Sequence, residues 1–310
     1  MVPIHSEKGR GIIMKILLIT IFLIFSLLSV DGKELNVATT YPYIASIVQQ
    51  VGGDRVDVQA LASGDWDPHV IVPKPSYIAK LRKADLLIMN GAQLEIGWLP
   101  PLMRQANNPK INVGSTGLLD LSQFVKLIEV PVGVSRAQGD IHPEGHPHFS
   151  LDPNNIPILS QAIANRLAEL DPAGKNVYLN NNKTFTEKWE SKLAKWNSKL
   201  EKVRGITVIE YHKLFDYFLR AYDLKLLGTI ETLPGIPPTS KHIADLEEKI
   251  ASDSVRFILQ DVYHSDDAAN LLGKKYGIRV VKIPHDVGAV KEATDIFKLF
   301  DEITRRLTND

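Results

Sequence analysis

The sequence predicts an α/β protein with two lobes, each a small parallel sheet flanked by helices, joined by one long rigid helix with a cleft between the lobes. Short strand-like runs alternate with amphipathic helical segments in both halves of the 310-residue chain. Such alternation is typical of parallel sheets covered by helices. A stretch without proline or glycine, residues 175–203, lies between the halves and predicts the connecting helix.

The first half contains four predicted strands. They are short and partly β-branched, and most of them stop at turn residues. They cover residues 35–40, 56–62, 85–90 and 111–116. Two segments between them, YPYIASIVQQVGG and KPSYIAKLRKA, carry apolar residues at helical spacing, and the first ends in glycines suited to capping a helix.

The second half follows a similar plan without a repeat in the sequence itself. Its predicted strands cover residues 207–211, 224–230, 255–260 and 279–284. The segments SKHIADLEEKIAS and AANLLGKKYG between them have helical periodicity. A second α/β unit is therefore expected.

The segment that joins the halves is predicted to be rigid. It follows a predicted helix, PILSQAIANRLAEL, that stops at DPAG. As one helix, residues 175–203 would span about 40 Å at ~1.5 Å per residue, unlike a flexible linker rich in glycine, serine or proline. One face carries Tyr178, Phe185, Trp189, Leu193, Trp196 and Leu200. Both tryptophans are predicted packing residues, and a hairpin broken around residues 180–182 is the alternative.

These elements divide the chain into four regions. An N-terminal extension and signal peptide covers residues 1–32, and an N-terminal α/β lobe covers residues 33–173. The linking helix covers residues 174–203, and a C-terminal α/β lobe covers residues 204–310.

The N-terminal region has the order of a secretory signal peptide. Translation is predicted to start at Met14, followed by Lys15, an apolar run, and the small residues Ser29 and Gly32. The run is shorter than the ~20 residues that a spanning helix needs. A cleaved signal and a periplasmic location are expected, with an uncleaved membrane anchor as the alternative.

Composition excludes several classes of function. The formal net charge is zero, whereas a nucleic-acid partner normally demands a basic surface. The chain has no cysteine, so disulfides, thiolate metal ligands, cysteine nucleophiles and a lipoprotein cysteine are not expected. Any metal must therefore be held by nitrogen and oxygen.

Four histidines and one aspartate lie in loops where such a metal could bind. His69 follows the second predicted strand, His148 precedes the helix starting near residue 156, His212 ends the first strand of the second half, and His285 and Asp286 follow the last strand. Ligands of open parallel sheets bind beyond the carboxyl ends of strands. Three imidazoles and the Asp286 carboxylate suit tetrahedral Zn²⁺.

Neighbouring residues support these candidate ligands. Pro68 and Pro147 restrict the backbone just before His69 and His148. Asp152 or Glu231 is a candidate acceptor for the second ring N–H of a ligating histidine.

The remaining histidines have weaker predictions. His142, His146 and His285 are candidate auxiliary metal contacts, with an ordinary surface loop as the alternative for the first two. His242, on a charged helix, and His264, in the loop YHSDD, are expected to face solvent.

Several segments together resemble a known family. TTYPYIASIVQQVGGDRVDVQALASGDWDPHV, ADLLIMNGAQLEIGWLPPLM, GHPHFSLDP, YHKLFDYF and ETLPGIPPTSKHIADL occur in order over nearly the whole chain after the signal. They are similar to the solute-binding proteins of zinc and manganese ABC transporters. The resemblance implies two α/β lobes joined by a rigid helix, with metal in the cleft and a membrane permease as partner.

The resemblance also implies a ligand set. Its motif positions fall on His69, His148, His212 and Asp286. A histidine at the third position is typical of the zinc-type subgroup, and glutamate there of manganese carriers.

The predicted function is therefore high-affinity binding of Zn²⁺ outside the cytoplasm and delivery to an ABC permease, by a monomer without enzymatic activity. The same fold carrying Mn²⁺ or Fe²⁺ is one alternative. A zinc-dependent hydrolase or hydratase is another, because three histidines with an open fourth position also describe a catalytic zinc. Against an enzyme, the sequence has no HExxH motif.

Overall fold

The computed structural model describes residues 34–133 and 142–308, which belong to one compact unit, residues 34–310. The predicted signal peptide and residues 134–141 of the histidine-bearing loop lie outside the described residues. Among the helices of the described part of the chain, none has both the length and the apolar character needed to cross a bilayer.

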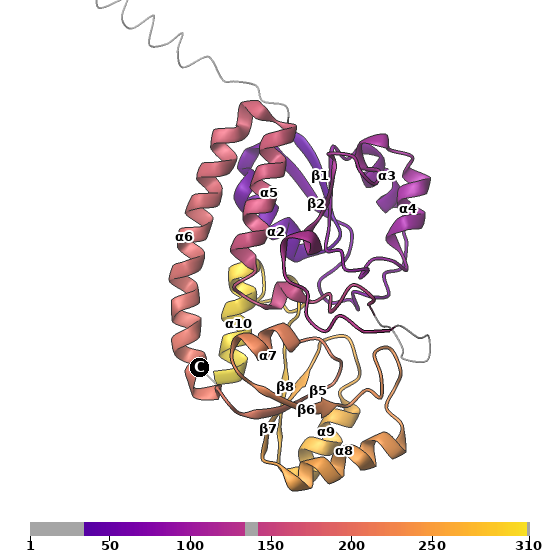
Figure 1. Ribbon diagram of the computed structural model, residues 1–310, viewed down its shortest axis with the longest axis vertical. Coiled ribbons are helices and arrows are strands. Elements are labelled where there is room, and N and C mark those ends of the chain that lie inside the picture. Colours follow the sequence, from indigo (N-terminus) through magenta and orange to yellow (C-terminus); the bar gives the residue numbers. More distant parts are fainter. Residues whose placement is uncertain (1–33, 134–141, 309–310) are drawn as a thin grey trace, which may run out of the picture. The chain divides into compact units, whose positions relative to one another are not determined.

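Two four-stranded parallel sheets form the framework (Figure 1). The first has the order β2-β1-β3-β4 and the second the order β6-β5-β7-β8, so both lobes share one strand order. The predicted fold class is confirmed. The strands are β1 (Leu35–Thr39), β2 (Val56–Ala60), β3 (Leu86–Met89), β4 (Leu118–Asp120), β5 (Thr207–Glu210), β6 (Lys225–Thr229), β7 (Val255–Gln260) and β8 (Arg279–Lys282).

Helices cover the sheets and connect their strands. They are α2 (Pro42–Gly52), α3 (Pro75–Lys83), α4 (Leu99–Ala106), α5 (Ile156–Leu170), α6 (Lys175–Leu200), α7 (Asp216–Ala221), α8 (Ser240–Ser252), α9 (Asp267–Tyr276) and α10 (Ile296–Thr308). Of these, α4, α7 and α10 are not among the helices predicted from periodicity.

Local sequence explains where these elements begin and end. The central strand β3 is a continuous apolar run whose first three residues are buried, as expected for a parallel strand covered on both faces. Helix α2 begins with Pro42, whose missing N–H costs nothing in the first turn. It ends at Gly52 and is followed by Gly53, where φ is 56°, a value that glycine adopts readily.

The linking segment is one helix of 26 residues, α6, so the alternative of a broken hairpin is wrong. It packs against α5, α2 and α10 (Figure 1). Trp189 is fully buried, lies 5.0 Å from Trp196 between ring centroids, and donates its indole N–H to the Pro153 carbonyl. Trp196 donates to Asp301 of α10, so both tryptophans pack as predicted and neither has an unpaired N–H.

The predicted strand at residues 111–116 is wrong, and the fourth strand lies later, at β4. Asn108 accepts a hydrogen bond from the Lys110 amide and starts a short 3₁₀ turn that includes Pro109. Gly114 then has a φ of 85°, which an extended strand cannot accommodate. Turn-forming residues therefore override the short apolar pattern here.

Candidate metal centre

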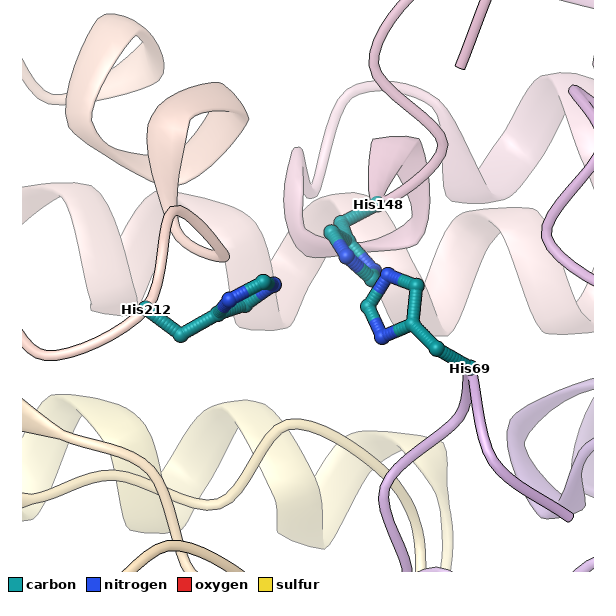
Figure 2. A group of neighbouring side chains, drawn as sticks. All are labelled: His69, His148 and His212. Carbon is teal, nitrogen blue, oxygen red and sulfur yellow. The ribbon is translucent and has the colours of Figure 1, made fainter. Parts of the chain in front are cut away.

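Three histidines from separate segments converge between the two sheets. Figure 2 shows the rings of His69, His148 and His212 directed toward one another. Each offers a ring nitrogen, and these three atoms lie within 4.8 Å of one another. His69 lies in the loop after β2, His148 immediately before a short 3₁₀ turn, and His212 just after β5. Two of the three histidines therefore lie beyond the carboxyl ends of strands, as the sequence predicts, and His148 joins them from the loop before α5.

An aspartate two residues away orients the His69 ring. Asp67 Oδ1 lies 2.9 Å from His69 Nδ1 and accepts the His69 backbone N–H at the same distance. Burial by itself raises the pKa of Asp67, but hydrogen bonds and charge interaction with His69 outweigh burial and lower this pKa to about 2. The ionised carboxylate favours a proton on Nδ1, which leaves the Nε2 lone pair for a cation.

Glu231 orients His212 in the second lobe. Its Oε2 lies 2.6 Å from His212 Nδ1, and both side chains are 4% exposed. The loop that carries His212 is held from behind, because Glu210 of β5 accepts the backbone amides of Leu214 and Phe215. The Nε2 atom of His212 is therefore presented on a fixed backbone.

His148 is buried with 6% exposure. Burial, followed by the neighbouring imidazoles, lowers its pKa well below the usual value. A neutral imidazole has the free lone pair that metal binding requires. A cavity of about 240 Å³ lined by all three histidines opens beside the group.

Asp286 is buried but does not belong to this group of three. Its Oδ1 accepts the backbone amides of Tyr43 and Val287 at 2.7 and 2.6 Å. Burial raises its pKa to about 8, although both amides act in the opposite direction. The carboxylate lies with His148 and His285 around a smaller adjoining cavity.

The candidate auxiliary histidines occupy three different surroundings. The His142 ring centroid lies 5.4 Å from that of His69, and its Nε2 is buried without a hydrogen-bond partner among the described residues. His285 packs edge-on against Tyr263 at 5.1 Å. His146 belongs to a second group of metal-capable side chains, with Glu129 and Asp216, but the Lys213 ammonium forms ion pairs with both carboxylates.

The two candidate acceptors also differ. Glu231 lies where the sequence predicts, against a ring nitrogen of His212. Asp152 instead accepts two hydrogen bonds from Asn154. Asp67 is not among the predicted acceptors, although its place within the DPH segment is a local signal that could have indicated it.

The predictions that His264 and His242 face solvent hold only in part, because both residues are partly exposed and both form hydrogen-bonding contacts. His264 is half-buried, with Nδ1 lying 2.9 Å from Asp261 and Nε2 lying 3.5 Å from Glu231. Its ring stacks on Tyr211. His242 Nε2 lies 2.8 Å from the Thr229 carbonyl oxygen. The contacts with Glu231 and Thr229 do not follow from local periodicity, because these partners lie on other elements, whereas Asp261 precedes His264 by three residues in the same loop.

Two parallel sheets with imidazoles converging between them define a two-lobed metal-binding protein. The chain belongs to the family described as zinc-uptake complex component A, periplasmic (ZnuA), whose sequence model matches residues 37–309. The resemblance inferred from the sequence is therefore confirmed.

Curated relatives include carriers named for different metals. The zinc-binding lipoprotein AdcA of Streptococcus pneumoniae is 25% identical over 256 residues, which cover 80% of this chain and 49% of AdcA, so the match spans about half of that relative. The metal ABC transporter substrate-binding lipoprotein SsaB of Streptococcus sanguinis is 30% identical over 235 residues, covering 73% of this chain and 72% of SsaB. The manganese ABC transporter substrate-binding lipoprotein PsaA of Streptococcus pneumoniae is 26% identical, covering 73% of this chain and 71% of PsaA.

Solved structures share the fold. The crystal structure of ZnuA aligns with a TM-score of 0.74 and 22% identity, covering 90% of this chain and 99% of that one. The cadmium-bound periplasmic metal-binding protein of Candidatus Liberibacter asiaticus aligns with a TM-score of 0.73 and 19% identity, covering 88% and 98%. The family is thus one of substrate-binding transport proteins, with both zinc and manganese among the named cargoes.

Proposed function

We propose that this protein binds one Zn²⁺ between its lobes, outside the cytoplasm, and delivers it to the membrane permease of an ABC transporter. The observation that carries the proposal is the convergence of His69, His148 and His212 from both lobes. Carboxylates fix the rings of two of them through Nδ1. This is the arrangement of a preorganised zinc site, in which second partners set the tautomer of each ligand.

The choice of zinc rests on the donor atoms. Three imidazole nitrogens favour zinc over the harder Mn²⁺, which prefers oxygen ligands. Asp286 is the proposed fourth ligand. Both hydrogen bonds that it accepts end on Oδ1, so Oδ2 is the oxygen proposed for the cation.

The proposed function also assigns a role to each region of the chain. Residues 33–173 and 204–310 act as the two lobes around the metal, and residues 174–203 link them. Residues 1–32 direct export and are removed, and the mature protein acts as a monomer in the periplasm without a nucleic-acid partner.

Metal analysis after chelation and back-titration tests the proposal. The chain from residue 33 should bind one zinc, and His212→Ala should weaken binding by about 100-fold or more, because removing a ligand costs at least as much as removing its supporting partner. His242→Ala is the control, since His242 does not belong to the group of three converging histidines and bonds the Thr229 carbonyl instead. Equal zinc affinity in wild type and His212→Ala would contradict a zinc site between the lobes.

Competition separates zinc from manganese. Excess Mn²⁺ should fail to displace Zn²⁺ from the wild-type protein, because the Irving–Williams order and the nitrogen donors both favour zinc. If Mn²⁺ displaced bound Zn²⁺ when both metals were present at comparable concentrations, manganese would be the cargo.

A further inference from the structure

The segments around His146 contact the second lobe through helix α7. The Tyr217 hydroxyl of α7 accepts the Ile128 backbone N–H at 3.1 Å and donates to the His146 carbonyl at 3.0 Å. One side chain of the second lobe thus holds two backbone segments of the first. The Tyr217 ring also lies against the His146 ring, with centroids 5.5 Å apart.

Both ring nitrogens of His146 already have partners. Nε2 lies 3.2 Å from the Lys213 carbonyl oxygen and 3.1 Å from Asp216 Oδ2. Because both neighbours are acceptors, the proton belongs on Nε2. Nδ1 faces the backbone N–H of His148 at 3.4 Å and accepts from it. The ring therefore connects the backbone of one metal-binding histidine with α7.

Helix α7 is in turn fixed to the other side of the metal centre. Glu210 accepts the amides of Leu214 and Phe215, which lie in the short segment between His212 and α7. Lys213, in that segment, pairs with Asp216 at 3.3 Å and with Glu129 of the first lobe. A displacement of His148 away from His212 must therefore break the contacts of His146.

We propose that His146 is a positioning residue that bonds the His148 segment to α7 and so holds His148 and His212 at metal-binding separation, which slows release of the cation. It does so without binding metal itself. This proposal rests on the proposed function, because it concerns the same interlobe centre. The buried hydrogen bond of His146 to the Lys213 carbonyl, together with the 3.1 Å ion-pair contact with Asp216, is strong enough to change a dissociation rate about tenfold.

Two substitutions at this position separate the positioning role from metal ligation. Glutamine in His146→Gln carries an amide N–H near the place of Nε2 and can reach Asp216. Asparagine in His146→Asn is too short to do so. The expected zinc dissociation rate, measured by stopped-flow transfer to a chelator, is within about twofold of wild type for glutamine and about tenfold faster for asparagine. Both variants should still bind one zinc, and Glu144→Gln, at an exposed position of the same segment, is the control.

A ligand role for His146 gives a different pattern. Neither amide replaces an imidazole in a zinc shell, so both variants would then lose affinity or stoichiometry alike. That result, or an unchanged release rate in His146→Asn, overturns the proposal.

A metal-free measurement keeps this test independent of the proposed function. Hydrogen exchange of the Ile128 amide, whose N–H is held by Tyr217, should accelerate about tenfold in His146→Asn and in Tyr217→Phe but not in His146→Gln. If wild-type protein binds no zinc yet shows this pattern, the interlobe contact stands while the proposed function fails. If the Ile128 amide exchanges at the same rate in wild type and in all three variants, the contact between the His146 segment and α7 is refuted.

Discussion

Glu231 Oε2 lies 2.6 Å from His212 Nδ1, in a place where both side chains are buried. The other oxygen of Glu231 lies 3.5 Å from His264, whose second nitrogen meets Asp261 at 2.9 Å. This row of alternating carboxylates and imidazoles joins the ends of β5, β6 and β7. It fixes the proton of His212 on Nδ1 and leaves Nε2 free for the cation.

Glu231→Gln should therefore weaken zinc binding by about tenfold, and Glu231→Ala by up to about 100-fold. Glutamine can still accept the ring N–H through its amide oxygen but lacks the charge that favours this tautomer. Competition with a chromogenic chelator measures both affinities. Glu247→Gln, which alters an exposed pair with Lys275, should leave the affinity unchanged, and a Glu231→Ala protein with wild-type affinity would contradict the orienting role.

The linking helix offers a prediction about stability. Trp189 is fully buried against Trp196 and Phe300, with ring centroids 5.0 and 5.2 Å away. Trp189→Ala should lower the free energy of unfolding by about 3–5 kcal/mol, because it leaves a cavity in the core and removes the hydrogen bond to Pro153. Urea titration measures the change, and Glu190→Ala, at an exposed position of the same helix, serves as the control. A loss below about 1 kcal/mol would mean that the helix does not depend on this packing.

Sequence periodicity was sufficient to predict the two sheets and the long helix. Seven of the eight strands and the long helix coincide with predicted segments, because parallel strands and amphipathic helices carry local patterns. The exception, β4, is only three residues long. Helix α4 begins with Leu99 and two prolines, and such a start gives little periodic signal. Packing between distant segments decides these short elements.

The metal centre could be predicted only in part. His69 follows β2 and His212 follows β5, so each was expected at the carboxyl edge of its own sheet, while His148 was placed only in the loop before α5. The partners of His146 and His264 lie on α7 and on the ends of β6 and β7. Their contacts depend on how the lobes and loops pack, which no local spacing encodes.

Asp171 predicts a pH dependence of stability. Its Oδ2 accepts hydrogen bonds from Arg55 and from the Tyr178 hydroxyl at 2.7 Å each. Burial alone raises the pKa of Asp171, but Tyr178 and then Arg55 outweigh burial, so the folded-state pKa lies below its usual value. The stabilisation is therefore present above the unfolded-state pKa and is lost as pH falls through the folded-state pKa.

Asp171→Asn should destabilise the protein by about 1 kcal/mol at pH 7. The difference from wild type should shrink as the pH falls below the usual pKa of an aspartate, because the wild-type carboxylate then becomes protonated. Urea titrations of both proteins at several pH values measure this, with Asp245→Asn, an exposed position of α8, as the control. A difference that is independent of pH would show that the charge of Asp171 does not contribute.

Zinc itself should stabilise the fold, because a cation held by both lobes binds the native state and not the separated ligands of the unfolded chain. At a free concentration about 1,000 times the dissociation constant, the gain is about 4 kcal/mol, or on the order of 10 °C in melting temperature for a chain of this size. Chelation should reverse the shift completely. His69→Ala should abolish most of it at the same zinc concentration, while Asp286→Asn should reduce it by a smaller amount, because the three imidazoles remain. A full shift in Asp286→Asn would exclude the carboxylate from the metal shell, and a full shift in His69→Ala would exclude the interlobe centre.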